Sequence, residues 1–271
     1  MEKLNFGCGS RACPGWTNID FHSNDPTVRR VDLLAGFPFP DDHFDIVYSS
    51  HVIEHFTREQ GLFLIREARR VLKPGGIIRV VVPDLEESCK EYLRILDMSD
   101  ADPSKRGIYD YIMIELLDQL VRTTPGGKLG PLIKNILQSG NEQFIAYVRG
   151  RTGSQLWSIN NRSSSVIDRM RQITSGNLST GMTYLYLKVI SGLIPKNLRS
   201  MVFLETSIGE RHRWMYDRYG IRKLFEEATF YNGIILRFDQ SGIPNFNEYC
   251  LDVNVDGTSY KRNSIYFEAR K

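Results

Sequence analysis

The stretch "KLNFGCGSRACPGWTNID" (residues 3–20) combines two strand signals with a glycine turn near the start of a 271-residue chain. Residues 3–6 are typical of a short strand, Gly7 and Gly9 follow it, and residues 17–21 predict a second strand carrying Asp20. Backbone without a Cβ atom can approach a ligand closely, and an acid after the next strand can accept hydrogen bonds from ribose hydroxyls. The stretch therefore predicts a turn that binds a nucleotide-type cofactor.

The spacing within this stretch narrows the choice of cofactor. Eight residues separate Gly9 from Asn18, and Pro14 and Gly15 are among them, so the helix that usually follows a glycine loop shrinks to a turn. Nicotinamide-binding units place their acidic residue about 20 residues beyond the glycines, after a complete helix. The spacing argues against a nicotinamide cofactor.

Strand and helix signals alternate through the first hundred residues. Residues 76–84 are rich in β-branched side chains, which is typical of a strand buried on both faces, and residues 57–76 predict a helix that Pro74-Gly75-Gly76 ends. The other strand signals fall at 29–34, 44–50, 233–239 and 264–271, the last alternating like a half-exposed edge strand. This alternation predicts an α/β domain with a mostly parallel sheet.

The middle of the chain has a different character. From about residue 85 to 205 the segments are helix-like and separated by breaks that contain glycine, serine and proline, and residues 217–230 predict a further amphipathic helix. We therefore expect a core formed by residues 1–95 and 206–271 and a helical insertion, residues 96–205, that covers an acceptor site.

Composition excludes several classes of protein. The formal charge of +3 is too mild to indicate a nucleic-acid partner, and the four cysteines lack the spacing of a disulfide framework. We find no signal-peptide pattern, and the most apolar stretch, residues 183–195, is too short to span a bilayer. We expect a cytoplasmic protein.

Several motifs in order resemble those of the class I S-adenosylmethionine-dependent methyltransferases. They are "LNFGCG" (4–9), "NID" (18–20), "VDLLAGFPFPDDHFDIVYSSHVIEHF" (31–56) and "VLKPGGIIRVVVPD" (71–84). The start of the chain, "HRWMYD" (212–217) and the terminal "SIYFEA" are similar to a bacterial subgroup associated with glycan or natural-product pathways. The resemblance implies a Rossmann-like, seven-stranded, mostly parallel sheet with helices on both faces.

The resemblance also implies a cofactor site for S-adenosyl-L-methionine. The glycine turn would back the methionine portion, Asp20 would bind the ribose, Asp32 and the backbone of Leu33 would contact adenine, and the serines after the fourth strand would face the sulfonium. Asn5 stands where many family members carry an acid. For Asp20 and Asp32 the structural alternative is a surface acid that ends a strand. The expected cofactor residues are Asn5, Gly7, Cys8, Gly9, Asp20, Asp32, Leu33, Ser49 and Ser50.

Candidate catalytic groups must lie at the carboxyl ends of the strands, where ligands bind in open α/β sheets. His51 follows the fourth strand directly and is the first candidate for a base or substrate-orienting group. His55 is a second candidate, although a structural role fits it better. His212 could belong to an acceptor-site lid or pack between insertion and core. Asp84 is better explained as the N-cap of the next helix.

A literal metal motif overlaps these histidines. "HVIEH" (51–55) fits the inverted zincin pattern H-x-x-E-H, which on a helix would place His51 and His55 on one face as zinc ligands. The motif lies at a strand-to-helix junction inside a methyltransferase-like phrase, and no downstream acidic helix offers a third ligand. We assign no metal ligand and keep a zinc peptidase as a remote alternative.

Together these patterns favour an O-methyltransferase acting on a saccharide or a small natural product. N-methylation of a small amine is the alternative within the same class, and a non-catalytic S-adenosylmethionine-binding partner protein is the alternative from another class. The expected partner is a small-molecule acceptor, with no nucleic acid and no membrane span. The sequence does not fix the oligomeric state, and a homodimer stays open.

Overall fold

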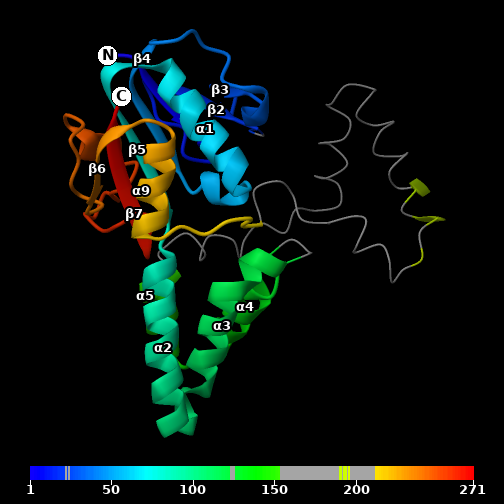
Figure 1. The fold of residues 1–271 in the computed structure, drawn as a ribbon. Coiled ribbons are helices and arrows are strands. Elements are labelled where there is room, and N and C mark those ends of the chain that lie inside the picture. Colours follow the sequence, from blue (N-terminus) through cyan, green and yellow to red (C-terminus); the bar gives the residue numbers. More distant parts are fainter. Residues whose placement is uncertain are drawn as a thin grey trace.

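The computed structural model describes residues 1–21, 23, 25–122, 126–152, 189–190, 192–193, 195 and 211–271. Seven strands form one sheet in the order β3-β2-β1-β4-β5-β7-β6 (Figure 1). They are β1 (Lys3–Phe6), β2 (Thr17–Asp20), β3 (Val28–Arg30), β4 (Phe44–Ser50), β5 (Leu72–Pro83), β6 (Tyr231–Leu236) and β7 (Ser264–Arg270). The pairs among β1 to β5 are parallel, and β7 runs antiparallel to β5 and β6. The sheet is mixed with one reversed strand, and the predicted α/β class is confirmed.

The last strand lies inside the sheet, so the prediction that residues 264–271 form a half-exposed edge strand is wrong. β7 pairs with β5 on one side and β6 on the other, and β6 forms the exposed edge. The error arose because polar residues alternate with apolar ones in β7, and this pattern indicated a side that faces solvent. Tyr266 and Glu268 are buried, and Glu268 forms an ion pair with Arg79 of β5.

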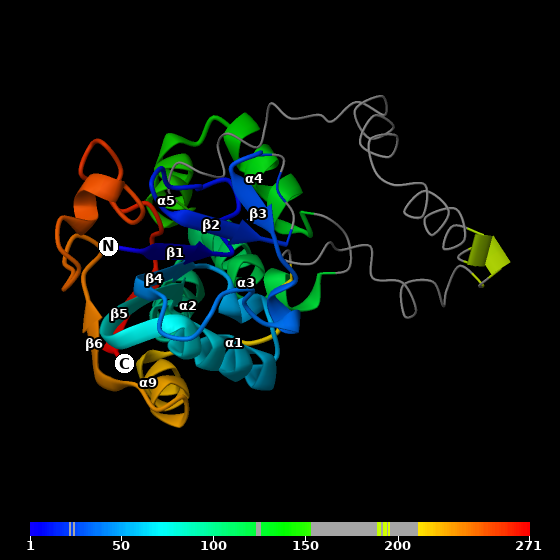
Figure 2. The ribbon, with the colours of Figure 1, turned by 90° about the horizontal axis from the view of Figure 1, so that it is seen from above.

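Helices α1 (Arg58–Val71) and α9 (Arg218–Glu227) cover one face of the sheet (Figure 2). α1 begins with a capping box in which Thr57 and Gln60 bond to each other's backbone. It ends at Val71, before the predicted stop at Pro74-Gly75-Gly76, because Leu72 already pairs with Phe44 in the sheet. The buried apolar residues of both helices form one core with the facing side chains of the strands.

An irregular segment, residues 237–263, covers the opposite face at the β5–β7 side; it is called the cover segment below (orange in Figure 2). Its regular helical structure is the short 3₁₀ helix η6 (Phe246–Tyr249). The core on this face consists of Cys13, Trp16, Ile46, Tyr48, Ile77, Val81, Ile243, Phe246, Leu251 and Tyr266. The expectation of helices on both faces is therefore wrong for this described part of the sheet. The absence of a helix between β1 and β2 is confirmed.

A buried arginine fastens the cover segment to the sheet. Arg79 is fully buried, and its guanidinium donates to Asp252 Oδ2 at 2.6 Å and Glu268 Oε1 at 2.7 Å. It also donates to backbone carbonyls of residues 237, 238 and 240. Tyr48 of β4 donates its hydroxyl proton to Asp252 Oδ1 at 2.5 Å. Strands β4, β5 and β7 thus share one polar network with the cover segment.

A group of helices projects from the carboxyl end of β5 (Figure 1). These are α2 (Leu85–Ala101), α3 (Arg106–Val121), α4 (Leu129–Gln138) and α5 (Glu142–Thr152), with the 3₁₀ helix η3 (Pro103–Lys105) between α2 and α3. Asp84 caps α2 by accepting from the N–H of Glu87, as predicted. The helices have a separate apolar core that includes Ile95, Tyr111 and Val148.

Much of the predicted helical insertion lies outside the described residues, namely 153–188 and most of 191–210. The division of the chain at residues 95 and 206 therefore stays a prediction. In the part of the chain that the structure describes, no helix is both long and apolar enough to cross a membrane.

Candidate active site

The glycine turn follows β1 and rests on β2. The backbone N–H of Gly7 donates to the carbonyl of Ile19 at 2.8 Å, and the N–H of Gly9 donates to Asp20 Oδ2 at 2.8 Å. Both glycines have positive φ, +66° and +53°. A Cβ atom at Gly7 would lie 2.3 Å from Val52 Cγ2, whereas one at Gly9 would meet no atom within 4 Å. Gly7 is required for packing, and Gly9 borders open space.

Asn5 holds the far end of this turn. Its buried Nδ2 donates to the carbonyl of Arg11 and to Asn18 Oδ1, both at 3.0 Å. Asn18 in turn accepts from the N–H of Cys13 and donates to its carbonyl. These two amides replace the missing helix as the support for residues 7–13. Asn5 thus has a structural task in addition to its place beside the cavity described next.

A cavity of about 190 Å³ opens between the glycine turn, the end of β4 and the cover segment. Six of the residues predicted to bind cofactor or act in catalysis line it: Asn5, Gly7, Cys8, Gly9, Ser50 and His51. Ser10, Arg11, Tyr48, Leu251, Tyr260 and Lys261 complete the wall. We call this the turn cavity.

The six residues that complete the wall of the turn cavity were missed by sequence reasoning, and three of them, Arg11, Tyr260 and Lys261, lie close together. The guanidinium of Arg11 lies 3.3 Å above the ring centroid of Tyr260, and Lys261 follows Tyr260. The Nε and Nη2 atoms of Arg11 are buried and have no hydrogen-bond partner in the described structure. Arg11 stands inside the glycine stretch and could have been suspected. No local signal links Tyr260 and Lys261 to a turn some 250 residues earlier in the chain.

The two serines that end β4 point to opposite faces. Ser50 lines the turn cavity with Tyr48, two residues before it, whereas Ser49 does not line it and is fully buried. This follows from the two-residue repeat of a strand. Neither serine hydroxyl has a hydrogen-bond partner among the residues that the structure describes. Of the two serines, only Ser50 lines the turn cavity, and its place beside the cofactor stays a prediction.

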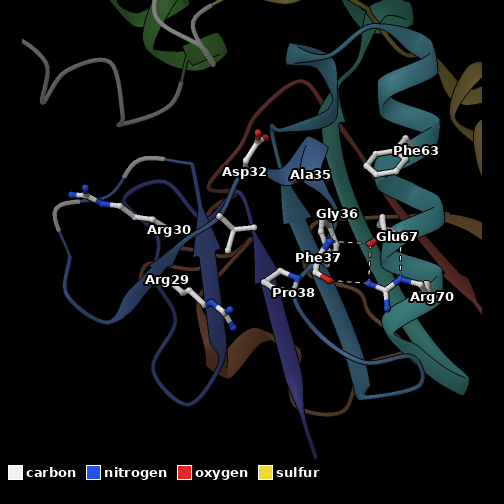
Figure 3. A pocket seen from close by; sticks show the side chains of 11 residues that line it. Arg29, Arg30, Asp32, Ala35, Gly36, Phe37, Pro38, Phe63, Glu67 and Arg70 are labelled. Atoms are coloured by element: carbon white, nitrogen blue, oxygen red, sulfur yellow. Dashed lines mark hydrogen bonds and ion pairs between the residues drawn. The ribbon is translucent and has the colours of Figure 1, made fainter. Parts of the chain in front are cut away.

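Of the two residues expected near adenine, Asp32 lines another cavity and Leu33 does not. Asp32 is exposed and caps the 3₁₀ helix η1 (Leu33–Ala35) by accepting from the N–H of Leu34, and Leu33 is buried in the core. Figure 3 shows Asp32 at the rim of a cavity of about 580 Å³ between this segment and α1. Glu67 and Arg70 form an ion pair in its wall.

Cys8 stays a thiol. It is buried, and burial together with the nearby negative charge of Asp20 raises the pKa of Cys8 to about 12. A thiol with so high a pKa is a poor nucleophile. Cys8 is therefore poorly suited to act as a nucleophile, and its backing of the cofactor stays a prediction.

His51 occupies the junction between the turn cavity and a second group of polar side chains. Its Nε2 lies 3.0 Å from Ser264 Oγ, and its Nδ1 lies 3.5 Å from Glu54 Oε1. Burial, with the positive charge of Lys261, lowers the pKa of His51, so the neutral imidazole is favoured. The residue has φ +55°, which turns the chain sharply as it leaves β4.

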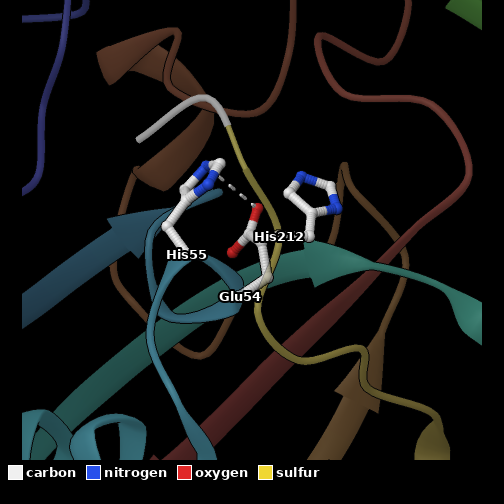
Figure 4. Close-up of side chains that lie close together, drawn as sticks. All are labelled: Glu54, His55 and His212. Atoms are coloured by element: carbon white, nitrogen blue, oxygen red, sulfur yellow. Dashed lines mark ion pairs between the residues drawn. The ribbon is translucent and has the colours of Figure 1, made fainter. Parts of the chain in front are cut away.

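Glu54, His55 and His212 form a buried group, called the Glu54 cluster below (Figure 4). One nitrogen or oxygen atom from each lies within 4.8 Å of the others. Burial raises the pKa of Glu54 to about 8 and, with neighbouring His55, lowers that of His212 to about 3. The predicted catalytic residues His51, His55 and His212 thus surround one carboxyl group.

The helical geometry assumed for "HVIEH" is absent. The 3₁₀ helix η2 (Ile53–His55) spans only the last three residues, and His51 precedes it with left-handed backbone. His51 and His55 therefore do not share a helical face. The group that could hold a metal instead joins Glu54 and His55 to His212 from the returning chain.

Sequence comparison agrees with this architecture. Residues 17–80, from β2 into β5, match the family model described as a methyltransferase domain. Residues 17–80 are therefore similar to a methyltransferase domain, and they make up less than a quarter of the chain. "Probable methyltransferase ltbC" of Aspergillus luteorubrus is 42% identical over 48 residues, which is 17% of this chain and 17% of that protein.

Solved structures similar to the domain include methyltransferases from two microbes. One from Mesorhizobium loti has 20% identity and a TM-score of 0.25, with 31% of this chain and 47% of that chain covered. One from Archaeoglobus fulgidus has 11% identity and a TM-score of 0.39, with 100% of this chain and 86% of that chain covered. The chain spans 17% of the length of the curated relative and less than half of the M. loti protein.

Proposed function

We propose that this protein methylates an oxygen of a saccharide or a small natural product, with S-adenosylmethionine as the methyl donor. The observation that carries the proposal is the turn cavity, where the glycine turn of the methyltransferase domain meets His51 at the end of β4. The acceptor class itself rests on the resemblance of the terminal segments to a glycan and natural-product subgroup.

The residues of the turn cavity fit the methionine end of the cofactor. The cofactor supplies an electrophilic methyl group on a sulfonium that leaves as a thioether. A cavity of about 190 Å³ is small beside the roughly 300–1,000 Å³ of ordinary ligand pockets, so it suits one end of the molecule. The unpartnered nitrogens of Arg11 could donate to its carboxylate, and Asp20 lies beside the turn at Gly9, where the ribose would follow.

Arg11→Met is expected to weaken S-adenosylmethionine binding by roughly 10–100-fold, because hydrogen bonds to a charged group contribute about 1.5–3 kcal/mol. Calorimetric titration of the purified chain would measure this. Arg66→Met, which removes an exposed arginine of α1 that donates to the carbonyl of Glu227, is the matched control and should bind normally. Equal affinities of the two variants would remove Arg11 from the cofactor site.

His51 is the group best placed to orient the acceptor or remove its proton. It lines the turn cavity, and Ser264 and Glu54 contact its two ring nitrogens, which fixes the imidazole plane. Trp214 supports an acceptor site nearby: its indole is 43% exposed, and its backbone N–H donates to the carbonyl of Glu54. A flat apolar face beside polar groups suits a sugar ring.

His51→Asn is expected to reduce turnover by about 100-fold or more while S-adenosylmethionine still binds, because general acid–base catalysis contributes about 10²–10⁴. Asparagine is chosen because it tolerates the positive φ of this position. The matched control is His43→Asn, which changes an imidazole stacked on Phe39 outside the cavity. Unimpaired turnover of His51→Asn would exclude a catalytic role.

The acceptor class can be tested with deuterated-methyl S-adenosylmethionine and a panel of saccharides, phenolic natural products and small amines. Mass spectrometry would locate the transferred label. A labelled ether supports the proposal, and a labelled amine would show N-methylation instead. Cofactor binding without transfer to any acceptor would favour a non-catalytic partner protein.

A further inference from the structure

The Glu54 cluster contains an unsatisfied carboxyl group. Glu54 is fully buried, and neither carboxyl oxygen has a hydrogen-bond partner among the described residues. The nearest ring nitrogens among the described residues are His51 Nδ1 at 3.5 Å and His55 Nε2 at 3.9 Å, and both imidazoles favour the neutral form. Burial of a carboxylate without a partner is strongly unfavourable, so such a group takes up a proton, pairs with a charge or binds a metal. A missing ligand at this point would explain the arrangement.

The surroundings of His55 fix which nitrogen faces Glu54. His55 Nδ1 lies 3.1 Å from the backbone carbonyl of Arg211, which can only accept, so Nδ1 carries the proton. The neutral ring then directs the lone pair of Nε2 toward Glu54 Oε1, 3.9 Å away. When Glu54 is ionised, two acceptors therefore face each other with no proton between them. A histidine whose other nitrogen donates to a carbonyl is the usual arrangement of a metal ligand.

The third member is held on the cluster by its backbone. The N–H of His212 donates to the carbonyl of Gln119 in α3 at 2.9 Å. The next two residues, Arg213 and Trp214, both donate their N–H groups to the carbonyl of Glu54, at 2.7 and 3.1 Å. The returning chain is thus bonded to η2 at the point where the His212 ring meets His55, with 4.9 Å between ring centroids.

We propose that Glu54, His55 and His212 bind one divalent transition-metal ion, for which Zn²⁺ is the best-fitting example. Two imidazoles and one carboxylate form a donor set used at catalytic zinc sites. Ligands about 2.0–2.2 Å from a tetrahedral zinc lie roughly 3.3–3.5 Å apart. The present separations of up to 4.8 Å would close with small side-chain rotations. This site differs from the sequence-based expectation, which assigned no metal ligand.

The ion would act at the acceptor. Three protein ligands leave a fourth position open, and His51, which contacts Glu54, links the cluster to the turn cavity. An acceptor oxygen in that position would be oriented, and the pKa of its hydroxyl would fall. This role rests on the proposed function, whereas metal binding itself does not.

Metal binding is tested on the full chain, freed of any purification tag and dialysed against EDTA. Calorimetric titration with ZnCl₂, without cofactor or acceptor, should show one ion per chain. At a hundredfold excess over Kd, the melting temperature should rise by roughly 5–10 °C. Absence of stoichiometric binding would overturn the proposal.

Two variants assign the ligands. Glu54→Gln keeps the side-chain shape without the charge, and His212→Asn removes an imidazole; each should weaken Zn²⁺ binding by roughly 100-fold or more. Metal-free Glu54→Gln should melt no lower than the metal-free parent, because the carboxyl group that it replaces is buried and has no hydrogen-bond partner among the described residues. His43→Asn is the control and should bind Zn²⁺ like the parent. Unchanged binding in both cluster variants would refute the assignment.

Methyl-transfer assays with and without Zn²⁺ separate the two proposals. Transfer by metal-free protein at the full rate, with no Zn²⁺ binding, would refute the metal site and leave the methyltransferase proposal intact. Stoichiometric Zn²⁺ binding that the cluster variants abolish would support the site even if no acceptor were methylated.

Discussion

Replacing Arg79 with methionine is expected to lower the free energy of unfolding by about 3–5 kcal/mol, the usual cost of removing one partner from a buried ion pair. The variant would leave the carboxyl groups of Asp252 and Glu268 buried without their cation. Three backbone carbonyls of the cover segment would also lose a donor. The effect should be large because the Arg79 guanidinium and the Asp252 carboxyl group are both fully buried.

Urea denaturation followed by circular dichroism would measure the loss. Arg58→Met is the matched control, because the Arg58–Glu227 pair is about one-third exposed and should contribute less than about 1 kcal/mol. Arg79→Lys should fall between the two, since an ammonium keeps the charge but cannot reach all five acceptors. Arg79→Lys can also replace Arg79→Met in this test if the methionine variant does not fold. Stabilities equal to the Arg58→Met control would contradict the expected effect.

The same substitution should weaken S-adenosylmethionine binding in any variant that remains folded. The cover segment carries Leu251, Tyr260 and Lys261 to the turn cavity, and Asp252 follows the first of these. Arg79 does not line that cavity, so a loss of affinity would be transmitted through the segment it holds.

This network also shows where the sequence is uninformative. The polar alternates of residues 264–271 imitate a solvent-facing strand, because nothing local reveals that Arg79, 189 residues before Glu268, will neutralise one of them. Strand β5 and the Asp84 cap could be predicted, since a run of β-branched residues and an N-cap are local signals.

The residues of the candidate site also divide into those that local sequence signals predict and those that depend on distant contacts. The glycine turn and His51 could be predicted because they follow strands directly, and the carboxyl ends of neighbouring parallel strands meet. The pairing of Glu54 with His212 could not, because the two residues are 158 positions apart in the sequence and the contact depends on how the returning chain crosses η2. The sequence also could not tell which of Ser49 and Ser50 lines the cavity. Side chains alternate along a strand, but which of them face the turn depends on the register of β4.

Gly7→Ala is expected to destabilise the protein by about 2–5 kcal/mol, from about 1–2 kcal/mol of left-handed backbone strain and about 1–3 kcal/mol of overpacking. The new Cβ would lie 2.3 Å from Val52 Cγ2 and 2.8 Å from Cγ1. Val52 is itself buried and follows His51, so it has little room to retreat.

Gly9→Ala is the matched control, because its φ of +53° carries a similar strain while its Cβ would meet nothing within 4 Å. Stability should therefore fall by only about 1–2 kcal/mol. Its Cβ would instead enter space beside the turn cavity that Gly9 lines, so S-adenosylmethionine affinity should fall more than stability does. Urea denaturation and calorimetric titration of both variants would show the contrast.

Val52→Ala provides the decisive test, because it removes the two methyl groups that a Cβ at Gly7 would strike and leaves only Val52 Cβ, 3.1 Å away. In a double-mutant cycle the pair should show a favourable coupling of about 1 kcal/mol or more. When Val52→Ala is combined with Gly9→Ala, the two losses of stability should add without coupling. Additive losses for the Gly7 pair would mean that strain alone, and not the contact between the turn and the exit of β4, requires glycine at this position.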